Sequence, residues 1–318
     1  MRLQNASQAI SSPSHSRQSG SAGTRERVLA VADELGWIPS GSARGLALQR
    51  ARIVGLLFPD LGHSGHAEED SPLYLDQVIR GAERAAASAG NAVLIAATSG
   101  PSGRELAFSV AGKVDGLVVL AGSLSEPDIA SLFRSMPIVV LATHRAGAGP
   151  DFVGADNRHG CRKITTHLIR VHGLTELTFL AGPAGSPDSD ERFAGFCEAL
   201  RQADLPAPHA PAAFGGFTEA GGRRAVKALL TEGPRPRAIV CGNDEMAIGA
   251  LTALRAARLR VPADIAVTGF DDIAVARHLR PALSTVRQPT SRLPGEIIAD
   301  RRWASPGVGL RWLFVWLF

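Results

Sequence analysis

Along most of the chain, short apolar runs alternate with stretches whose apolar positions recur every three to four residues. The apolar runs are bounded by turn residues and predict buried strands at 53–60, 91–98, 115–122, 137–143, 152–157, 177–182, 238–244 and 265–272. The stretches of helical period predict helices at 73–90, 105–112, 126–135, 160–173, 190–204, 218–233 and 245–259. This alternation predicts an α/β fold with two doubly wound parallel-sheet subdomains. In such folds, ligands bind beyond the carboxyl ends of the strands.

The chain before residue 53 follows a different pattern. Residues 1–23 are rich in Ser, Gln and Gly without helical period, which predicts a disordered or misframed segment. The stretch TRERVLAVADELGW (24–37) predicts a helix with Thr24 as its N-cap and Gly36 just beyond its end. An apolar stripe on this helix would comprise Val28, Leu29, Val31, Ala32 and Leu35. The stretch SGSARGLALQR (40–50) predicts a second, short helix with too little apolar surface to fold alone.

Composition and charge narrow the function classes. With 45% hydrophobic residues, the chain cannot be disordered throughout. Residues 1–52 hold seven Arg against three acidic residues, which fits contact with a polyanion or, equally well, a solvated tail. No apolar run is long enough to cross a membrane, and no apolar segment of a secretory signal follows the first residues. The three cysteines lie far apart, which argues against a disulfide framework and for a reducing cytoplasm.

Several motifs, in their order and spacing, resemble one family. The stretch TRERVLAVADELGWIPSGSARGLALQRARIVGLLFPDL is similar to the join between DNA-binding headpiece and core in LacI/GalR-family (lac-repressor-type) transcriptional regulators. Further matches are DFVGADN (151–157), DERFAGF (190–196), GGFTEAGG (215–222), CGNDEMAIGA (241–250) and VTGFDDIAVARHLRPALSTVRQP (267–289). Together they cover the chain from residue 24 to about residue 296, so the chain is identified as a member of this family.

The resemblance implies a domain organisation. The core would consist of two periplasmic-binding-protein-like subdomains, preceded by a partial helical DNA-binding headpiece and a hinge helix. We expect a disordered or misframed N-terminus at 1–23, a remnant headpiece helix and hinge helix at 24–51, an N-terminal core subdomain at 52–153 plus about 285–300, a C-terminal core subdomain at 154–284, and an atypical tail at 301–318.

The resemblance also implies a DNA contact in the hinge helix. The residues that match it are Ser42, Ala43, Arg44 and Leu46. In the family, the leucine at the position of Leu46 is wedged between base pairs in the minor groove of the operator. Unstacking the bases costs a few kcal/mol and kinks the DNA, so that more protein surface meets it. The pattern alone favours an ordinary exposed leucine at position 46, and the family resemblance reverses this preference.

Six residues match effector-binding positions of the family: Tyr74, Asp156, Arg192, Phe217, Asn243 and Asp271. The fixed donors of the Arg192 guanidinium suit hydroxyl pairs or a carboxylate. Asp271 follows a predicted strand, where a carboxylate can accept from two sugar hydroxyls. Tyr74 and Phe217 offer rings that can stack on a ligand.

Each of these residues also has a structural explanation. Arg192 could be a surface arginine, and Phe217 could simply be packed. Asp272 could replace Asp271 or cap a helix. Asn243 could cap the helix predicted from residue 245, a role that its neighbour Asp244 could also fill.

Metal and enzyme chemistry find little support. Five possible metal ligands lie in the loop after the first strand: His63, His66, Glu68, Glu69 and Asp70. Their spacing without a scaffold is weak evidence for a metal site, and a solvated loop explains them better. No G-x-S-x-G lies at a strand-to-helix turn, and no G-x-G-x-x-G or P-loop follows a strand. We therefore predict no enzyme, no catalytic residue, no metal and no cofactor.

The two ends depart from the family's pattern. A helix-turn-helix should precede Thr24, but residues 1–23 lack its turn motif, so DNA binding is expected to be impaired. After LPGEIIAD, the chain continues as RRWASPGVGLRWLFVWLF, whose apolar end fits no element of the fold. Loss of the reading frame at both ends of the gene would explain these departures.

The function predicted is that of a DNA-binding transcriptional regulator, a repressor. A small effector, a carbohydrate, would bind between the core subdomains and control the affinity for operator DNA. We further predict a cytoplasmic homodimer without a membrane partner, since two-fold symmetric operators match two-fold symmetric proteins. The alternative is a sugar-binding module of periplasmic-binding-protein type without DNA binding. The missing signal peptide speaks against it.

Overall fold

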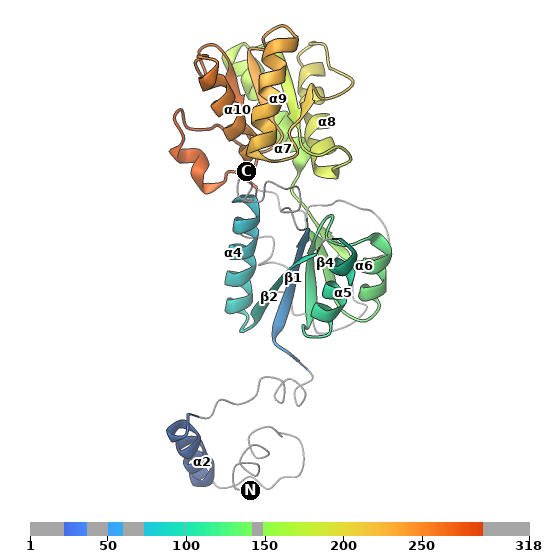
Figure 1. Cartoon of the computed structure of the whole chain (residues 1–318), viewed down its shortest axis with the longest axis vertical. Helices are drawn as coiled ribbons and strands as arrows, with labels where there is room; N and C mark the ends of the chain where they lie inside the picture. Colours follow the sequence, from blue (N-terminus) through green and yellow to red (C-terminus); the bar gives the residue numbers. More distant parts are fainter. Residues whose placement is uncertain (1–21, 37–49, 60–72, 99, 142–148, 289–318) are drawn as a thin grey trace.

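The computed structural model describes residues 22–36, 50–59, 73–98, 100–141 and 149–288. Most of them form two α/β subdomains, one above the other in Figure 1. The N-terminal subdomain comprises the described residues of 50–153, and the C-terminal subdomain comprises 154–288. Each is built around one parallel sheet with helices on both faces. The predicted fold class is confirmed.

The N-terminal subdomain contains a five-stranded parallel sheet in the order β2-β1-β3-β4-β5. Helix α4 and the sheet face beneath it bury one apolar cluster, and helices α5 and α6 bury a second on the opposite face. The central strand β3 is buried along its whole length, as expected for a strand covered on both faces. The elements are β1 (Ile53–Pro59), α4 (Leu73–Ser88), β2 (Ala92–Thr98), α5 (Gly100–Ala111), β3 (Gly116–Leu120), α6 (Glu126–Phe133), β4 (Ile138–Leu141) and β5 (Asp151–Val153).

The C-terminal subdomain contains a four-stranded parallel sheet in the order β7-β6-β8-β9. Helices α7 and α8 pack together on one face, and α9 and α10 pack together on the other. The elements are α7 (Asn157–His172), β6 (Leu177–Ala181), α8 (Pro187–Arg201), β7 (Ala213–Phe214), α9 (Glu219–Glu232), β8 (Ala238–Cys241), α10 (Asp244–Ala256), β9 (Ala266–Thr268) and the 3-10 helix η1 (Ala274–His278).

After η1, the chain returns along the C-terminal sheet. Ser284 pairs with Thr268, Arg287 pairs with Asp271, and Val286 packs against the core beside α7 and α8. Residues 284–288 therefore run beside the end of β9 and the residues that follow it, whereas we expected the return to the N-terminal subdomain at about residue 285. The remainder of that segment and the tail 301–318 lie outside the described residues.

Helix α2 (Ala22–Glu34) precedes the core and lies apart from both subdomains in Figure 1. It begins two residues before the predicted N-cap, so Thr24 lies inside the helix and the prediction of its capping role is wrong. Gly36 has a positive φ of 60° just beyond the helix, as predicted. The apolar side chains of this helix and of the residue that follows it remain exposed, namely Leu29 by 50%, Val31 by 53% and Leu35 by 62%.

Some element boundaries differ from the prediction. The strand predicted at 152–157 is shorter, because β5 ends at Val153 and α7 begins at Asn157. Helix α5 begins at Gly100, before the predicted stretch. The two-residue strand β7 and η1 are too short for their periodicity to be recognised. No helix among the described residues is long and apolar enough to span a bilayer.

Candidate functional site

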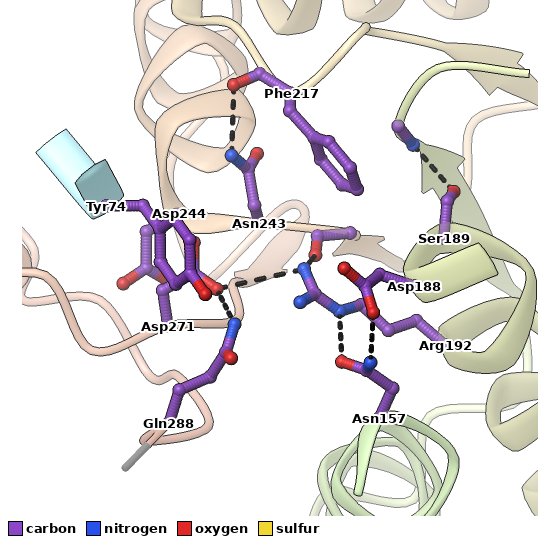
Figure 2. A network of polar contacts seen from close by, with 12 residues as sticks. Tyr74, Asn157, Asp188, Ser189, Arg192, Phe217, Asn243, Asp244, Asp271 and Gln288 are labelled. Carbon is purple, nitrogen blue, oxygen red and sulfur yellow. Dashed lines mark hydrogen bonds and ion pairs between the residues drawn. The ribbon is translucent and has the colours of Figure 1, made fainter. Parts of the chain in front are cut away.

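A network of polar side chains lies at the carboxyl ends of the C-terminal strands, with Arg192 at its centre (Figure 2). Arg192 lies in the second turn of α8, which follows β6, and is only 4% exposed. Its Nε donates to Asn157 Oδ1 at 2.8 Å, and its Nη1 donates to the carbonyl oxygen of Gly242 at 2.6 Å. The guanidinium is therefore held from two sides, by α7 and by the loop after β8, and its orientation is fixed.

Asp271 supplies the carboxylate that faces this guanidinium. Its Oδ1 lies 3.7 Å from Arg192 Nη1, and both side chains are buried. Gln288 Nε2 donates to the same oxygen at 2.5 Å. Burial raises the pKa of Asp271 to about 8, although Arg192 lowers it.

The backbone holds Asp271 in an unusual conformation. Its φ is 128°, and that of the next residue, Asp272, is 56°. Non-glycine residues in such regions cost about 1–3 kcal/mol, and they concentrate at functional sites. Asp272 points elsewhere: its carboxylate accepts from Arg287 Nε at 2.5 Å and from Arg277 Nη2 at 3.4 Å, at the surface. Of these two candidates, Asp271 is therefore the one that faces Arg192.

Asp188 forms the second acidic group of the network and was not predicted. It lies in the first turn of α8, one turn before Arg192. Its Oδ1 accepts from Asn157 Nδ2 at 2.8 Å, so the Asn157 amide bridges Asp188 and Arg192. Burial raises the pKa of Asp188, while Arg192 and Asn157 act in the opposite direction. The neighbouring Ser189 accepts a hydrogen bond from Gly182 N at 2.9 Å and holds this turn against the end of β6.

Two aromatic rings flank the guanidinium. Arg192 lies 4.0 Å from the centre of the Phe270 ring and 5.5 Å from that of Phe217. The Phe217 ring passes directly over Gly182, where a Cβ atom would lie 2.3 Å from the ring. Only glycine at 182 therefore leaves room for Phe217, which itself adopts a positive φ of 64°.

Asn243 has a structural role in the network. Its Oδ1 accepts from Met246 N at 3.0 Å and caps α10, and its Nδ2 donates to the carbonyl oxygen of Phe217 at 3.0 Å. Asp244, the other candidate for this cap, instead accepts from Ile273 N at 2.9 Å and from Thr285 Oγ1 at 2.5 Å. Asn243 thus positions Phe217. Asp244 holds together the two segments after β9 that contain Ile273 and Thr285.

Tyr74 reaches this network from the N-terminal subdomain, at the start of α4. Burial raises the pKa of its hydroxyl above the usual range, and the nearby charges of Asp271 and Asp188 raise it further. The backbone N–H of Tyr74 donates to Glu245 Oε1 at 3.4 Å, and Gln77 Nε2 donates to the carbonyl oxygen of Asp272 at 3.2 Å. The N-terminal end of α4 therefore contacts the C-terminal subdomain beside the site.

The predicted site residues thus fall into two groups. Five of them lie in or beside the network: Tyr74, Arg192, Phe217, Asn243 and Asp271. Asp156 is exposed instead, and its carboxylate accepts from His159 N at 3.0 Å and caps α7. The residues that were not predicted are Asn157, Asp188, Phe270 and Gln288. Asp188 could have been recognised, because it precedes Arg192 by four residues and so shares its helix face.

The remaining predictions concern residues that the structure does not describe. The hinge residues Ser42, Ala43, Arg44 and Leu46 lie outside the described residues, as do His63, His66, Glu68, Glu69 and Asp70. In the part of the chain that is described, no group of three or more His, Cys, Asp or Glu side chains is placed to hold a metal ion.

Two doubly wound parallel subdomains with a polar network at the strand ends define a core of the periplasmic-binding-protein type. A model of the periplasmic binding protein-like domain matches residues 165–299. The ribose operon repressor of Escherichia coli (strain K12) is 31% identical over 279 residues, which cover 86% of this chain and 81% of the repressor.

Solved structures agree with this assignment. The complex of the transcriptional regulator CelR with cellobiose has a TM-score of 0.68 and 30% identity, covering 91% of this chain and 86% of CelR. The lac repressor dimer bound to operator and the anti-inducer ONPF has a TM-score of 0.75 and 26% identity, covering 93% of this chain and 86% of that chain. The chain belongs to the LacI family of transcriptional regulators. These similarities favour a repressor over a transport module.

Proposed function

We propose that this regulator binds a small carbohydrate effector at the network around Arg192, between its two subdomains, and that the effector controls its affinity for operator DNA. The observation that carries this proposal is the buried pair of Arg192 and Asp271 at the strand ends. Its guanidinium and carboxylate offer fixed donors and acceptors side by side, which suits adjacent hydroxyls. Phe217 and Tyr74 add aromatic surface that can pack on a sugar ring.

The position of Tyr74 supports binding between the subdomains. Tyr74 belongs to the N-terminal subdomain and its side chain reaches the network, while Arg192 and Asp271 belong to the C-terminal subdomain. A ligand that touches all three would favour the arrangement in which the subdomains meet. Such a preference is what an effector needs in order to shift a conformational equilibrium.

The partners follow from the family assignment. We propose that the chain acts as a homodimer on operator DNA in the cytoplasm, where a transcriptional regulator would work. Support comes from its relatives, which include a lac repressor dimer bound to operator. We propose no enzymatic activity and no cofactor, because the relatives are named as regulators and repressors.

The test is ligand-induced thermal stabilisation of the full chain. Pentoses, hexoses, disaccharides and nucleosides are screened by differential scanning fluorimetry, and hits are measured by calorimetry. A ligand at a hundred times its Kd should stabilise the protein by about 2.7 kcal/mol. Arg192→Lys and Asp271→Asn should abolish this stabilisation. The matched control Asp264→Asn, in the exposed pair with Arg260, should retain it.

Two results would contradict the proposal. Retention of the full ligand shift by both site variants would show that the ligand binds elsewhere. Failure of every neutral carbohydrate and nucleoside to stabilise the protein would remove the proposed effector class. DNA binding is tested separately by mobility shift on palindromic sequences upstream of the gene, with and without the hit. Loss or gain of the shifted band on adding the ligand is the expected result.

A further inference from the structure

The charges around Arg192 do not balance among the described residues. Asp271 faces its Nη1 at 3.7 Å, and Asp188 is joined to its Nε through the Asn157 amide. Figure 2 shows the two carboxylates on different sides of one guanidinium. With both acids ionised, this group of three side chains carries one net negative charge. No second cation belongs to the described part of the network.

The donors of Arg192 are largely in use. Its Nε and Nη1 donate to Asn157 and to Gly242, and none of the described residues accepts from Nη2. A ligand hydroxyl can accept from Nη2 and donate to a carboxylate at the same time. An anion can only accept, so it would gain one donor while approaching two like charges in a partly buried site.

The position of Asp188 in α8 sharpens this argument. Ser186 caps the helix, and Asp188 lies in its first turn. A helix N-terminus attracts anions through its free N–H groups and its dipole. Asp188 places the protein's own carboxylate at this end of the helix, beside Arg192, where a phosphate or carboxylate of a ligand would otherwise find its best position.

We infer that Asp188 is a specificity-determining residue, which makes the site select neutral polyols and reject anionic ligands such as sugar phosphates and sugar acids. This inference rests on the proposed effector site, and it specifies the class of ligand admitted there. Replacing Asp188 by Asn removes the charge, while the Asn oxygen can still accept from Asn157. The variant should therefore keep the geometry around Arg192 and open the site to anions.

Sulfate is the probe, because it is a small dianion and needs no knowledge of the effector. Melting temperatures are measured at about pH 9, above the pKa of about 8 that burial gives Asp271, so that this carboxylate is ionised as well. Millimolar sulfate is compared with sodium chloride of equal ionic strength. Asp188→Asn should gain a sulfate-dependent rise in Tm of about 2–5 °C, and the wild type should show none.

Two matched variants isolate the effect of Asp188. Asp190→Asn removes an exposed charge from the same first turn of α8 and should behave as the wild type. The double variant Asp188→Asn/Arg192→Met should lose the gain, because the guanidinium supplies the free donor. Asp188→Ser serves as a second neutral variant should Asp188→Asn fold poorly, and it should show the same gain.

The inference is overturned if sulfate stabilises the wild type as strongly as the neutral variants, or if both folded neutral variants gain nothing. Either result leaves the proposed function standing, provided that a neutral carbohydrate stabilises the wild type. Conversely, a gain of sulfate binding without any response to neutral carbohydrates would support the charge selection and contradict the proposed effector.

Discussion

The two subdomains share a parallel α/β architecture but contribute unequally to the site. The C-terminal subdomain supplies Arg192, Asp271, Asp188 and their supporting residues, whose side chains contact one another. From the described part of the N-terminal subdomain, the side chain of Tyr74 joins the network. The same fold thus carries a buried polar network in the C-terminal subdomain and, in the N-terminal subdomain, a helix end that contacts it. Function depends on the residues at the strand ends.

Their ion pairs differ in the same way. In the N-terminal subdomain, Arg104 pairs with Asp128 at 2.8 Å, and the Arg104 side chain is 62% exposed. In the C-terminal subdomain, the side chains of Arg192 and Asp271 are 5% and 3% exposed. Water screens the first pair, but removing one partner of the second leaves a buried charge without compensation.

The largest expected effect follows from this contrast. At about pH 9, where Asp271 is ionised, Arg192→Ala should lower the free energy of unfolding by about 3–5 kcal/mol, because Asp271 and the Gly242 carbonyl lose a buried partner. Arg104→Ala should change it by less than about 1 kcal/mol. Chemical denaturation of both variants measures the difference. Equal losses would mean that burial does not distinguish the two pairs.

The pH dependence of stability should be the next largest effect. Burial raises the pKa of Asp271 to about 8, so its protonated form is favoured in the folded state. The free energy of unfolding should therefore fall as the pH rises from the pKa of an unfolded carboxyl group, about 4, to about 8. Asp271→Asn should flatten this decline, as measured by thermal melts across that range. An unchanged slope in the variant would assign the decline to other groups.

The smallest effect on stability is expected at the contact between the subdomains. Gln77→Ala removes the hydrogen bond to the Asp272 carbonyl and should cost no more than about 1 kcal/mol. Its effect should appear in ligand binding, because the contact favours the arrangement in which α4 meets the site. Calorimetry with a ligand found by the screen should give a weaker Kd for the variant. An unaltered Kd would separate this contact from ligand binding.

The sequence predicted the strands and helices well where apolar periodicity was strong. Strand β3 and helix α10 illustrate this, since both are dominated by buried apolar side chains. Thr24 illustrates the limit. A threonine before an apolar stripe is a typical N-cap, but a cap requires a backbone outside the helix, and here the helix starts at Ala22.

The site was less predictable than the fold. Arg192 and Asp271 were predicted through the family resemblance, because they lie in motifs that match the family. Asn157 and Gln288 carry no local signal, since their roles arise from hydrogen bonds across 35 and 17 residues of sequence. The exposed cap Asp156 shows the converse, in which a matching motif names a residue whose carboxylate is already used locally.

The segment 284–288 contains a side chain, that of Gln288, which would respond to a ligand at the site. Asp271 Oδ1 is the atom that faces Arg192 and also the atom that accepts from Gln288. Gln288 is the last residue of the C-terminal subdomain that the structure describes. A ligand hydroxyl that donates to this oxygen would compete with Gln288 for it, so occupancy of the site would weaken the contact that holds Gln288 beside Asp271. Asp271 Oδ1 would then both bind the effector and change the contact with Gln288 when the effector binds.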